Sequence, residues 1–258
     1  MPIDFHDAVN RRTYSGRSAH ESWRQAVVGL VDPVGAAVVD IGCGGGTYTR
    51  AWHDLGATTV TGVDFSEPIL DSARTAHGDL PGVFFRQGDA AATGLDGSCA
   101  DIVFARALIH HVPDLAAFAT EAARLLRSGG VVLVQDRTPE DVARPGAPTR
   151  PRGWFFDVFP RLLAVENSRR PTAGAVSAAL GSAGFGTLTV AGLEEVRRCY
   201  ADRQDYLGEI AQRTGRSILH ELSDAELDHL VDELRHRLPA GPLVEQDRWT
   251  LWRGVRLS

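Results

Sequence analysis

The chain has 258 residues, 43% of them hydrophobic, so it can bury one good core with an appended cap. Its net charge of −6 provides no bulk attraction to nucleic acid, although a local arginine patch could still bind an anion. No lysine is present, so all 27 basic residues are arginine, which excludes a P-loop lysine, a Schiff-base lysine and a lysine general base.

The cysteines and the apolar runs bear on the compartment. Cys43, Cys99 and Cys199 are scattered without a C-x-x-C spacing, so they predict neither a disulfide framework nor a zinc site. Residues 1–14 lack the pattern of a signal peptide, and no apolar run approaches the length of a membrane span. We therefore expect a cytoplasmic protein that binds neither nucleic acid nor membrane, with a homodimer as one option for its oligomeric state.

Short apolar strands alternate with helices along the chain. Residues 1–34 are polar and are expected to be helical, with an apolar stripe that includes Trp23 and Val27. The expected strands are residues 36–41, 58–63, 83–86, 101–105, 131–134 and 188–196, with an edge strand at 247–255. The expected helices lie at about 47–55, after Ser66, after Asp114, at about 172–183 and, as two stretches, between 200 and 240. This order predicts an α/β fold: a Rossmann-like, doubly wound, mostly parallel sheet with an antiparallel edge strand and a helical cap.

Regular alternation breaks after residue 136. Residues 137–152 are rich in proline and arginine and are expected to form a loop. We expect a single domain over residues 1–258, with a cofactor-binding core at about 35–136. The cap pieces are expected at about 1–34, 137–170 and 200–240.

Residues 38–49 read as a buried strand that ends in an acid, then a glycine loop, then the start of a helix. Such a turn needs positive φ angles and leaves no room for Cβ atoms beside a ligand, and it presents a helix N-terminus to whatever lies above the sheet. A dinucleotide fingerprint requires a third glycine where this chain has Thr47, which disfavours NAD. Asp64, at the end of the second strand, is placed to bind a ribose diol in either kind of site.

Four segments, in order, resemble the motifs of class I S-adenosylmethionine-dependent methyltransferases. They are residues 40–46, 88–90, 101–112 and 125–133. The chain is most similar to the small-molecule branch, such as the quinone-biosynthesis-like methyltransferases. The resemblance covers residues 36–136 and leaves the rest of the chain without an assigned motif.

The resemblance implies S-adenosyl-L-methionine as the cofactor and S-adenosyl-L-homocysteine as the product. Gly42, Gly44 and Gly46 would let the backbone approach the methionine part. Asp40 would engage the ammonium of that part, directly or through water. Asp64 would accept both ribose hydroxyls, or it would simply cap the turn that follows it.

The same resemblance implies an adenine site. Phe65 would flank the ring, Asp89 would accept from the exocyclic amine, and the Ala90 N–H would donate to the ring; Asp89 as a plain loop carboxylate is the alternative. A backbone carbonyl near Arg106 would help to hold the amino group of the cofactor. Tyr14 resembles an aromatic residue that closes over the cofactor, and it could equally be a surface tyrosine.

His110 and His111 follow the fourth strand, at the carboxyl edge where ligands bind in such sheets. Methyl transfer is an in-line displacement that needs a base only if the acceptor must lose a proton. At most one histidine is expected to be that base, and the alternative is that one packs or hydrogen-bonds a neighbouring loop while the other lines the pocket. No third ligand has the spacing for a metal site.

The aromatic run at 154–159 is expected to form a lid or pocket wall. Trp154, Phe155 and Phe159 would then line the substrate pocket, or they would only bury the cap. Arginines flank this run and could meet an acidic substrate or form a solvated loop; they are Arg137, Arg144, Arg150 and Arg152.

The sequence therefore predicts methyl transfer from S-adenosylmethionine to a small-molecule acceptor, of apolar or aromatic character. A nicotinamide-dependent oxidoreductase and a non-catalytic S-adenosylmethionine-binding module are the alternatives. The sequence does not identify the acceptor or the atom that is methylated.

Overall fold

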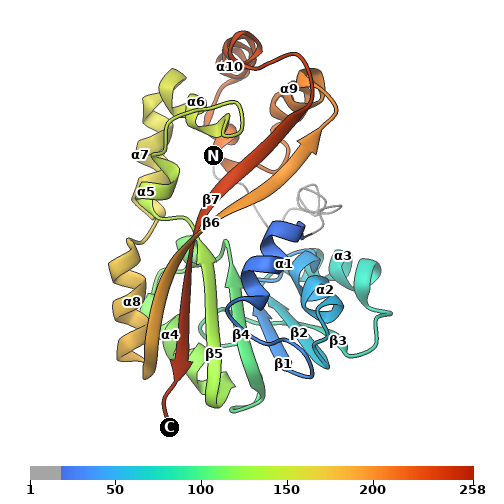
Figure 1. Ribbon diagram of the computed structural model, residues 1–258, viewed down its shortest axis with the longest axis vertical. Coiled ribbons are helices and arrows are strands. Elements are labelled where there is room, and N and C mark those ends of the chain that lie inside the picture. Colours follow the sequence, from blue (N-terminus) through green and yellow to red (C-terminus); the bar gives the residue numbers. More distant parts are fainter. Residues whose placement is uncertain (1–18) are drawn as a thin grey trace. The chain divides into compact units, whose positions relative to one another are not determined.

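The computed structural model describes residues 19–258 and contains one seven-stranded sheet in the order β3-β2-β1-β4-β5-β7-β6 (Figure 1). The strands are β1 Ala37–Ile41, β2 Thr59–Asp64, β3 Val83–Gln87, β4 Ala100–Arg106, β5 Leu126–Asp136, β6 Phe185–Tyr200 and β7 Leu243–Arg256. The pairs among β1 to β5 are parallel, and β7 runs antiparallel to β5. The predicted Rossmann-like, mostly parallel sheet is confirmed.

Helices connect the strands. They are α1 Glu21–Val28, α2 Thr47–Asp54, α3 Glu67–His77, α4 Leu115–Leu125, α5 Pro139–Val142, α6 Arg152–Val158, α7 Pro160–Arg169, α8 Ala173–Ser182, α9 Arg203–Ala211 and α10 Asp224–Arg237. Local side chains satisfy the free N–H groups at several helix starts. Asp114 accepts from two backbone N–H groups of α4, and Ser223 forms the expected capping box with Glu226 at α10.

Two sequence-based expectations need correction. Residues 137–152 are not all loop, because Thr138 and Asp141 form a capping box that starts α5. The last strand does not lie at the edge of the sheet, because β7 is inserted between β5 and β6. Its run of buried residues from Trp249 to Trp252 is typical of an inner strand, whereas much of β6, the edge strand, is exposed.

The described chain divides into two compact units, and the division falls within β6 and β7. The sheet unit comprises residues 19–136, 171–193 and 250–258, and the helical unit comprises residues 137–170 and 194–249. Whether both make up a single methyltransferase domain stays a prediction. No helix of the described residues has both the length and the apolar composition to cross a membrane.

The core of the sheet unit contains buried aliphatic residues from the central strands and from α4 and α8, which lie side by side (Figure 1). An aromatic cluster joins α1 and α2 to β4. The Trp23 ring lies 5.5 Å from Trp52 and 5.8 Å from Phe104, both edge-on, and its indole N–H donates to Gln135 Oε1 at 3.0 Å. The described part of residues 1–34 therefore packs into the sheet unit.

The helical unit has its own apolar core and a buried ionic cluster. Arg216 donates to Glu245 at 2.6 Å and to Glu209 at 2.5 Å, and Arg197 donates to Glu245 at 2.7 Å. Burial alone would raise the pKa of Glu245, but the charges of Arg197 and Arg216 outweigh burial and hold this pKa below its usual range. Removing either the acidic or the basic side chains of this cluster would leave the remaining buried charges without counter-charges.

Candidate functional site

The loop between β1 and α2 carries three glycines in the left-handed backbone region. Their φ angles are 73° at Gly42, 53° at Gly44 and 80° at Gly46. The Gly42 N–H donates to Val63 O at 2.7 Å, which ties the start of the loop to β2. Glycine adopts these angles without the steric cost that a Cβ atom imposes.

At two of these glycines a Cβ atom would also collide with a neighbouring side chain. A Cβ at Gly42 would lie 2.8 Å from Leu108 Cδ1, and a Cβ at Gly46 would lie 2.9 Å from Phe85 Cζ. A Cβ at Gly44 would meet nothing within 4 Å. The backbone at Gly44 therefore faces open space, where a ligand can approach it closely.

Asp40, the second-last residue of β1, is almost fully buried, and its carboxylate accepts a hydrogen bond from Thr49 Oγ1 at 2.7 Å. Burial raises the pKa of Asp40 to about 7; the Thr49 hydrogen bond and the Arg106 charge oppose this rise, and the Asp64 carboxylate adds to it. A bound cation such as an ammonium would favour the charged form of Asp40. This carboxyl group is therefore suited to a positively charged ligand group.

Asp64 ends β2 and is also buried. Its two oxygens accept from the backbone N–H groups of Gly44, at 2.9 Å, and Ser66, at 3.0 Å. Burial raises the pKa of Asp64, and these N–H donors oppose the rise. An ionised carboxylate offers about four lone-pair sites, so acceptor capacity remains for ligand hydroxyls. Asp64 thus fixes both the glycine loop and the start of α3, and a ribose-binding role stays a prediction.

The predicted adenine residues follow adjacent parallel strands. Phe65, after β2, is 44% exposed, and its carbonyl accepts from the Gln87 side chain at 3.0 Å. Asp89, after β3, is exposed and accepts from the Ala91 N–H at 2.8 Å, while Ala90 is half-buried against the core. The roles of Phe65, Asp89 and Ala90 toward adenine stay predictions, and Tyr14 lies outside the described residues.

Arg106 ends β4, and its guanidinium lies 4.2 Å from the centroid of the Tyr48 ring. Ala107 follows with a φ of 51°, which is unusual for a residue with a Cβ, and its N–H donates to Gln135 O at 2.9 Å. The chain thus turns sharply where β4 ends. The turn leads directly into the segment that carries both candidate bases.

His110 and His111 lie on a 3₁₀ turn, Ile109–His111, and a carboxylate contacts His110 at close range. His110 Nδ1 lies 2.9 Å from Asp136 Oδ2 and 3.0 Å from Asp136 Oδ1. The Asp136 side chain is fully buried, and that of His110 is 9% exposed, whereas His111 is exposed. With an ionised Asp136, Nδ1 carries the proton, and Nε2 is the nitrogen that can accept another.

Sequence reasoning missed three residues that build this site: Thr49, Tyr48 and Asp136. An acid at the end of the strand next to β4 was a signal for Asp136, since adjacent parallel strands end at the same edge. Tyr48 left no such signal, because its partner Arg106 is distant in the sequence, whereas Thr49 lies close to Asp40 along the chain and could have been considered. Among residues 19–258, no group of three or more His, Cys, Asp or Glu side chains could hold a metal ion.

The predicted substrate-pocket aromatics lie in the helical unit. Phe155 is fully buried in the core of that unit, and Trp154 is half-buried against Gly146. Phe159 is half-buried and lies edge-on to His229, with 6.0 Å between ring centroids. All three have packing roles, and a role in acceptor binding stays a prediction.

Comparison with known proteins bears on the sheet unit. Residues 39–134 match the family described as "Methyltransferase domain". The chain is 32% identical over 187 residues to a nocamycin O-methyltransferase of Saccharothrix syringae, which covers 67% of this chain and 65% of that protein. It is 38% identical over 102 residues to a ubiquinone biosynthesis O-methyltransferase of Rhizobium leguminosarum bv. trifolii, covering 39% of this chain and 40% of that protein. The chain thus spans less than two thirds of either relative.

A solved structure supports the fold. An S-adenosylmethionine-dependent methyltransferase from Mesorhizobium loti superposes with a TM-score of 0.54 at 22% identity, covering 91% of this chain and 97% of that one. Residues 39–134 are therefore similar to the methyltransferase family, and the solved structure shares the fold of this chain. The predicted resemblance to methyltransferases is confirmed for these residues, and both relatives named above are O-methyltransferases.

Proposed function

We propose that this chain transfers a methyl group from S-adenosylmethionine to a hydroxyl oxygen of a small molecule, with His110 as the general base. The His110–Asp136 contact at 2.9 Å is the observation that carries the proposal. A base is useful only when the acceptor must lose a proton, as a hydroxyl does. The two relatives, both O-methyltransferases by name, support the same type of acceptor.

The residues of the sheet unit fit the cofactor. The open backbone at Gly44 suits the close approach of its amino-acid part, Asp40 suits its ammonium, and Asp64 suits its ribose diol. The cofactor, when bound, supplies an electrophilic methyl group on a sulfonium. The protein then has to align the acceptor with that methyl group and to exclude water, which contributes several kcal/mol to rate enhancement.

His110 supplies the proton acceptor in this scheme. Nε2 takes the acceptor's proton, and the buried Asp136 carboxylate holds the ring in one tautomer and stabilises the imidazolium that forms. General-base catalysis of this kind contributes about 10²–10⁴-fold. His111 is exposed and is not assigned this role.

Two alternatives make different predictions. A nicotinamide-dependent oxidoreductase is disfavoured by Thr47 at the position of the third fingerprint glycine. A non-catalytic binding module would bind the cofactor and methylate nothing. The His110–Asp136 pair favours catalysis, since a module that only binds a cofactor has no use for an oriented base.

The proposal is tested by following labelled methyl transfer from S-adenosylmethionine to a panel of phenols, enols and aliphatic hydroxy compounds. We expect His110→Gln to lower kcat about 10²–10⁴-fold on the best acceptor while S-adenosylhomocysteine affinity stays unchanged. His111→Gln, which alters the adjacent ring, is the matched control and should retain activity. Full activity of His110→Gln would refute its role as a base, and cofactor binding without any methylated product would favour the binding module.

The acceptor pocket is a separate proposal, in which Trp154 and Phe159, the partly exposed members of the predicted set, bind an apolar part of the acceptor, whereas the fully buried Phe155 packs behind them. Trp154 is half-buried, so part of its indole ring is accessible to a ligand. We expect Trp154→Leu to raise the acceptor KM and to leave S-adenosylhomocysteine affinity unchanged. Equal losses of both would show that the indole ring serves only to pack the helical unit.

A further inference from the structure

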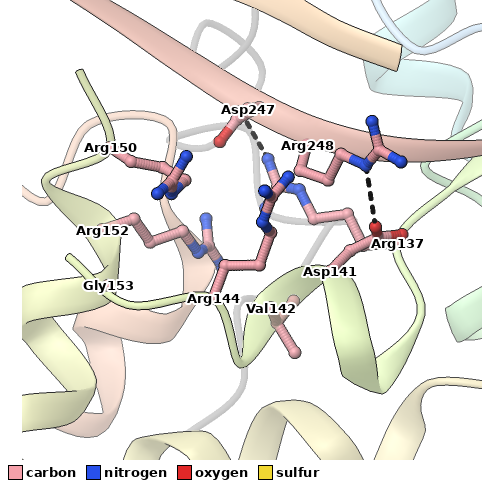
Figure 2. Close-up of a pocket in the computed structure, with 9 residues that line it drawn as sticks. All are labelled: Arg137, Asp141, Val142, Arg144, Arg150, Arg152, Gly153, Asp247 and Arg248. Atoms are coloured by element: carbon pink, nitrogen blue, oxygen red, sulfur yellow. Dashed lines mark ion pairs between the residues drawn. The ribbon is translucent and has the colours of Figure 1, made fainter. Parts of the chain in front are cut away.

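The helical unit contains a cavity of about 20 Å³ that five arginine side chains line (Figure 2). We call it the arginine pocket; its arginines are Arg137, Arg144, Arg150, Arg152 and Arg248. Every lining residue belongs to the helical unit, from α5 and the segments around it and from β7. A cavity of this volume has room for one or two water-sized groups.

The acidic side chains that line the pocket are fewer than its arginines. Two aspartates line the pocket: Asp247 forms an ion pair with Arg137, and Asp141 lies 3.5 Å from Arg248. The five lining arginines therefore exceed the two lining aspartates by three positive charges.

The acids outside the lining are shared between arginines. Glu194 lies 2.5 Å from Arg144 and 3.7 Å from Arg248. Glu166 lies 2.9 Å from Arg152 and also pairs with Arg169 and Arg170. Adding these two acids and these two further arginines leaves the excess among the residues named here at three positive charges.

Arg150 is the least compensated of the five. Its side chain makes one hydrogen bond, from Nε to Pro145 O at 3.3 Å, and no ion pair with any residue of the described range. Its backbone is held, because the Arg150 N–H donates to Ala147 O at 2.7 Å and the neighbouring Thr149 O accepts from Gln246 at 2.7 Å. Figure 2 shows the guanidinium groups of Arg144, Arg150 and Arg152 directed into the same space beside Asp247.

Two of these arginines are also largely buried, which makes their positive charges less favourable. The side chains of Arg137 and Arg152 are 9% and 15% exposed, and Arg152 Nε has no hydrogen-bond partner within the described residues. Burial lowers the pKa of Arg137 to about 10; Asp247 opposes this effect, and Arg152 and Arg170 add to it. An anion among these groups would relieve their mutual repulsion and supply the missing acceptors.

We propose that the arginine pocket binds the oxyanion of a small molecule, a carboxylate or a phosphate group. Planar guanidinium groups match both anions through paired N–H···O bonds, which is the chemistry that arginine provides best. The small volume selects the head group of a ligand over a bulky ring, and the held loop around Arg150 reduces the entropy lost on binding. This site does not depend on the proposed methyl transfer.

Isothermal titration of the full chain at constant ionic strength tests the proposal, with inorganic phosphate and tricarballylate as separate probes. Arg150→Gln removes the guanidinium that lacks an acid partner. Arg198→Gln is the matched control, because it removes the same charge from the same unit at a side chain that is 61% exposed and lies outside the pocket. Thermal unfolding of each variant confirms that it folds.

We expect at least one probe to bind the wild-type chain and Arg150→Gln to weaken it about tenfold or more, with less than a twofold change in Arg198→Gln. Arg150→Lys keeps the charge but lacks the forked guanidinium group, so its affinity for the probe should lie between those of wild type and Arg150→Gln. Binding of phosphate alone would assign the site to phosphorylated ligands, and binding of tricarballylate alone would assign it to carboxylic acids. Absence of binding by both probes, or equal weakening in Arg150→Gln and Arg198→Gln, would overturn the proposal.

Discussion

The buried Asp40 carboxyl gives the folded chain a proton that the unfolded chain does not hold. Its pKa rises from 3.8 to about 7 on folding, a difference of about three units. At 1.36 kcal/mol per unit, charged Asp40 costs at most about 4 kcal/mol of stability. Because the folded state binds this proton more tightly, the free energy of unfolding falls as pH rises from about 4 to about 7.

Asp40→Asn removes this titration and keeps an oxygen that can accept from Thr49. We expect the variant to match wild type near pH 4 and to exceed it by up to about 4 kcal/mol above pH 7, where the wild-type cost is complete. Urea unfolding of both chains at intervals from pH 4 to 8.5 measures this difference. Asp79→Asn, at an exposed position, is the control for a changed net charge. A wild-type–variant difference that does not change with pH would refute the buried, proton-binding Asp40.

Three further predictions concern stability, and urea unfolding checks each. Gly46→Ala should cost about 1–3 kcal/mol, because the residue has a φ of 80° and its Cβ would lie 2.9 Å from Phe85; an unchanged midpoint would contradict the strain. Glu245→Gln should cost about 3–5 kcal/mol, since Arg216 would lose one of its two buried counter-charges, and a near-neutral effect would show that the cluster is solvated. Gly146→Ala should destabilise the chain by about 1–3 kcal/mol, because a Cβ there would overlap the neighbouring indole ring, and a stable variant would mean that this ring is free to move.

The sheet was predictable because its signals are local. Each of the first five strands contains a short apolar run, and the helix after Asp114 begins at a side chain that caps it. The glycine loop and Asp64 were predictable for the same reason, since their spacing along one β-α-β unit is short. The structure then showed that Asp64 also holds the loop, through Gly44.

The rest depended on contacts between distant segments. β7 pairs with β5, which places Val131 opposite Val255. No local sequence pattern predicts such a pairing. The choice of His110 over His111 depends on Asp136, a residue that lies 26 positions further along the chain. Likewise, the arginines after residue 136 were more typical of a solvated loop than of an anion site until their partners were known.

Isothermal titration of the wild-type chain with S-adenosylhomocysteine, and separately with NADH, tests the central claim most directly. We predict that S-adenosylhomocysteine binds with one site per chain and that NADH does not bind. Asp64→Asn should weaken S-adenosylhomocysteine binding by about 1–3 kcal/mol, because ribose hydroxyls would lose a charged acceptor. Binding of NADH together with no binding of S-adenosylhomocysteine would contradict the assignment of this site.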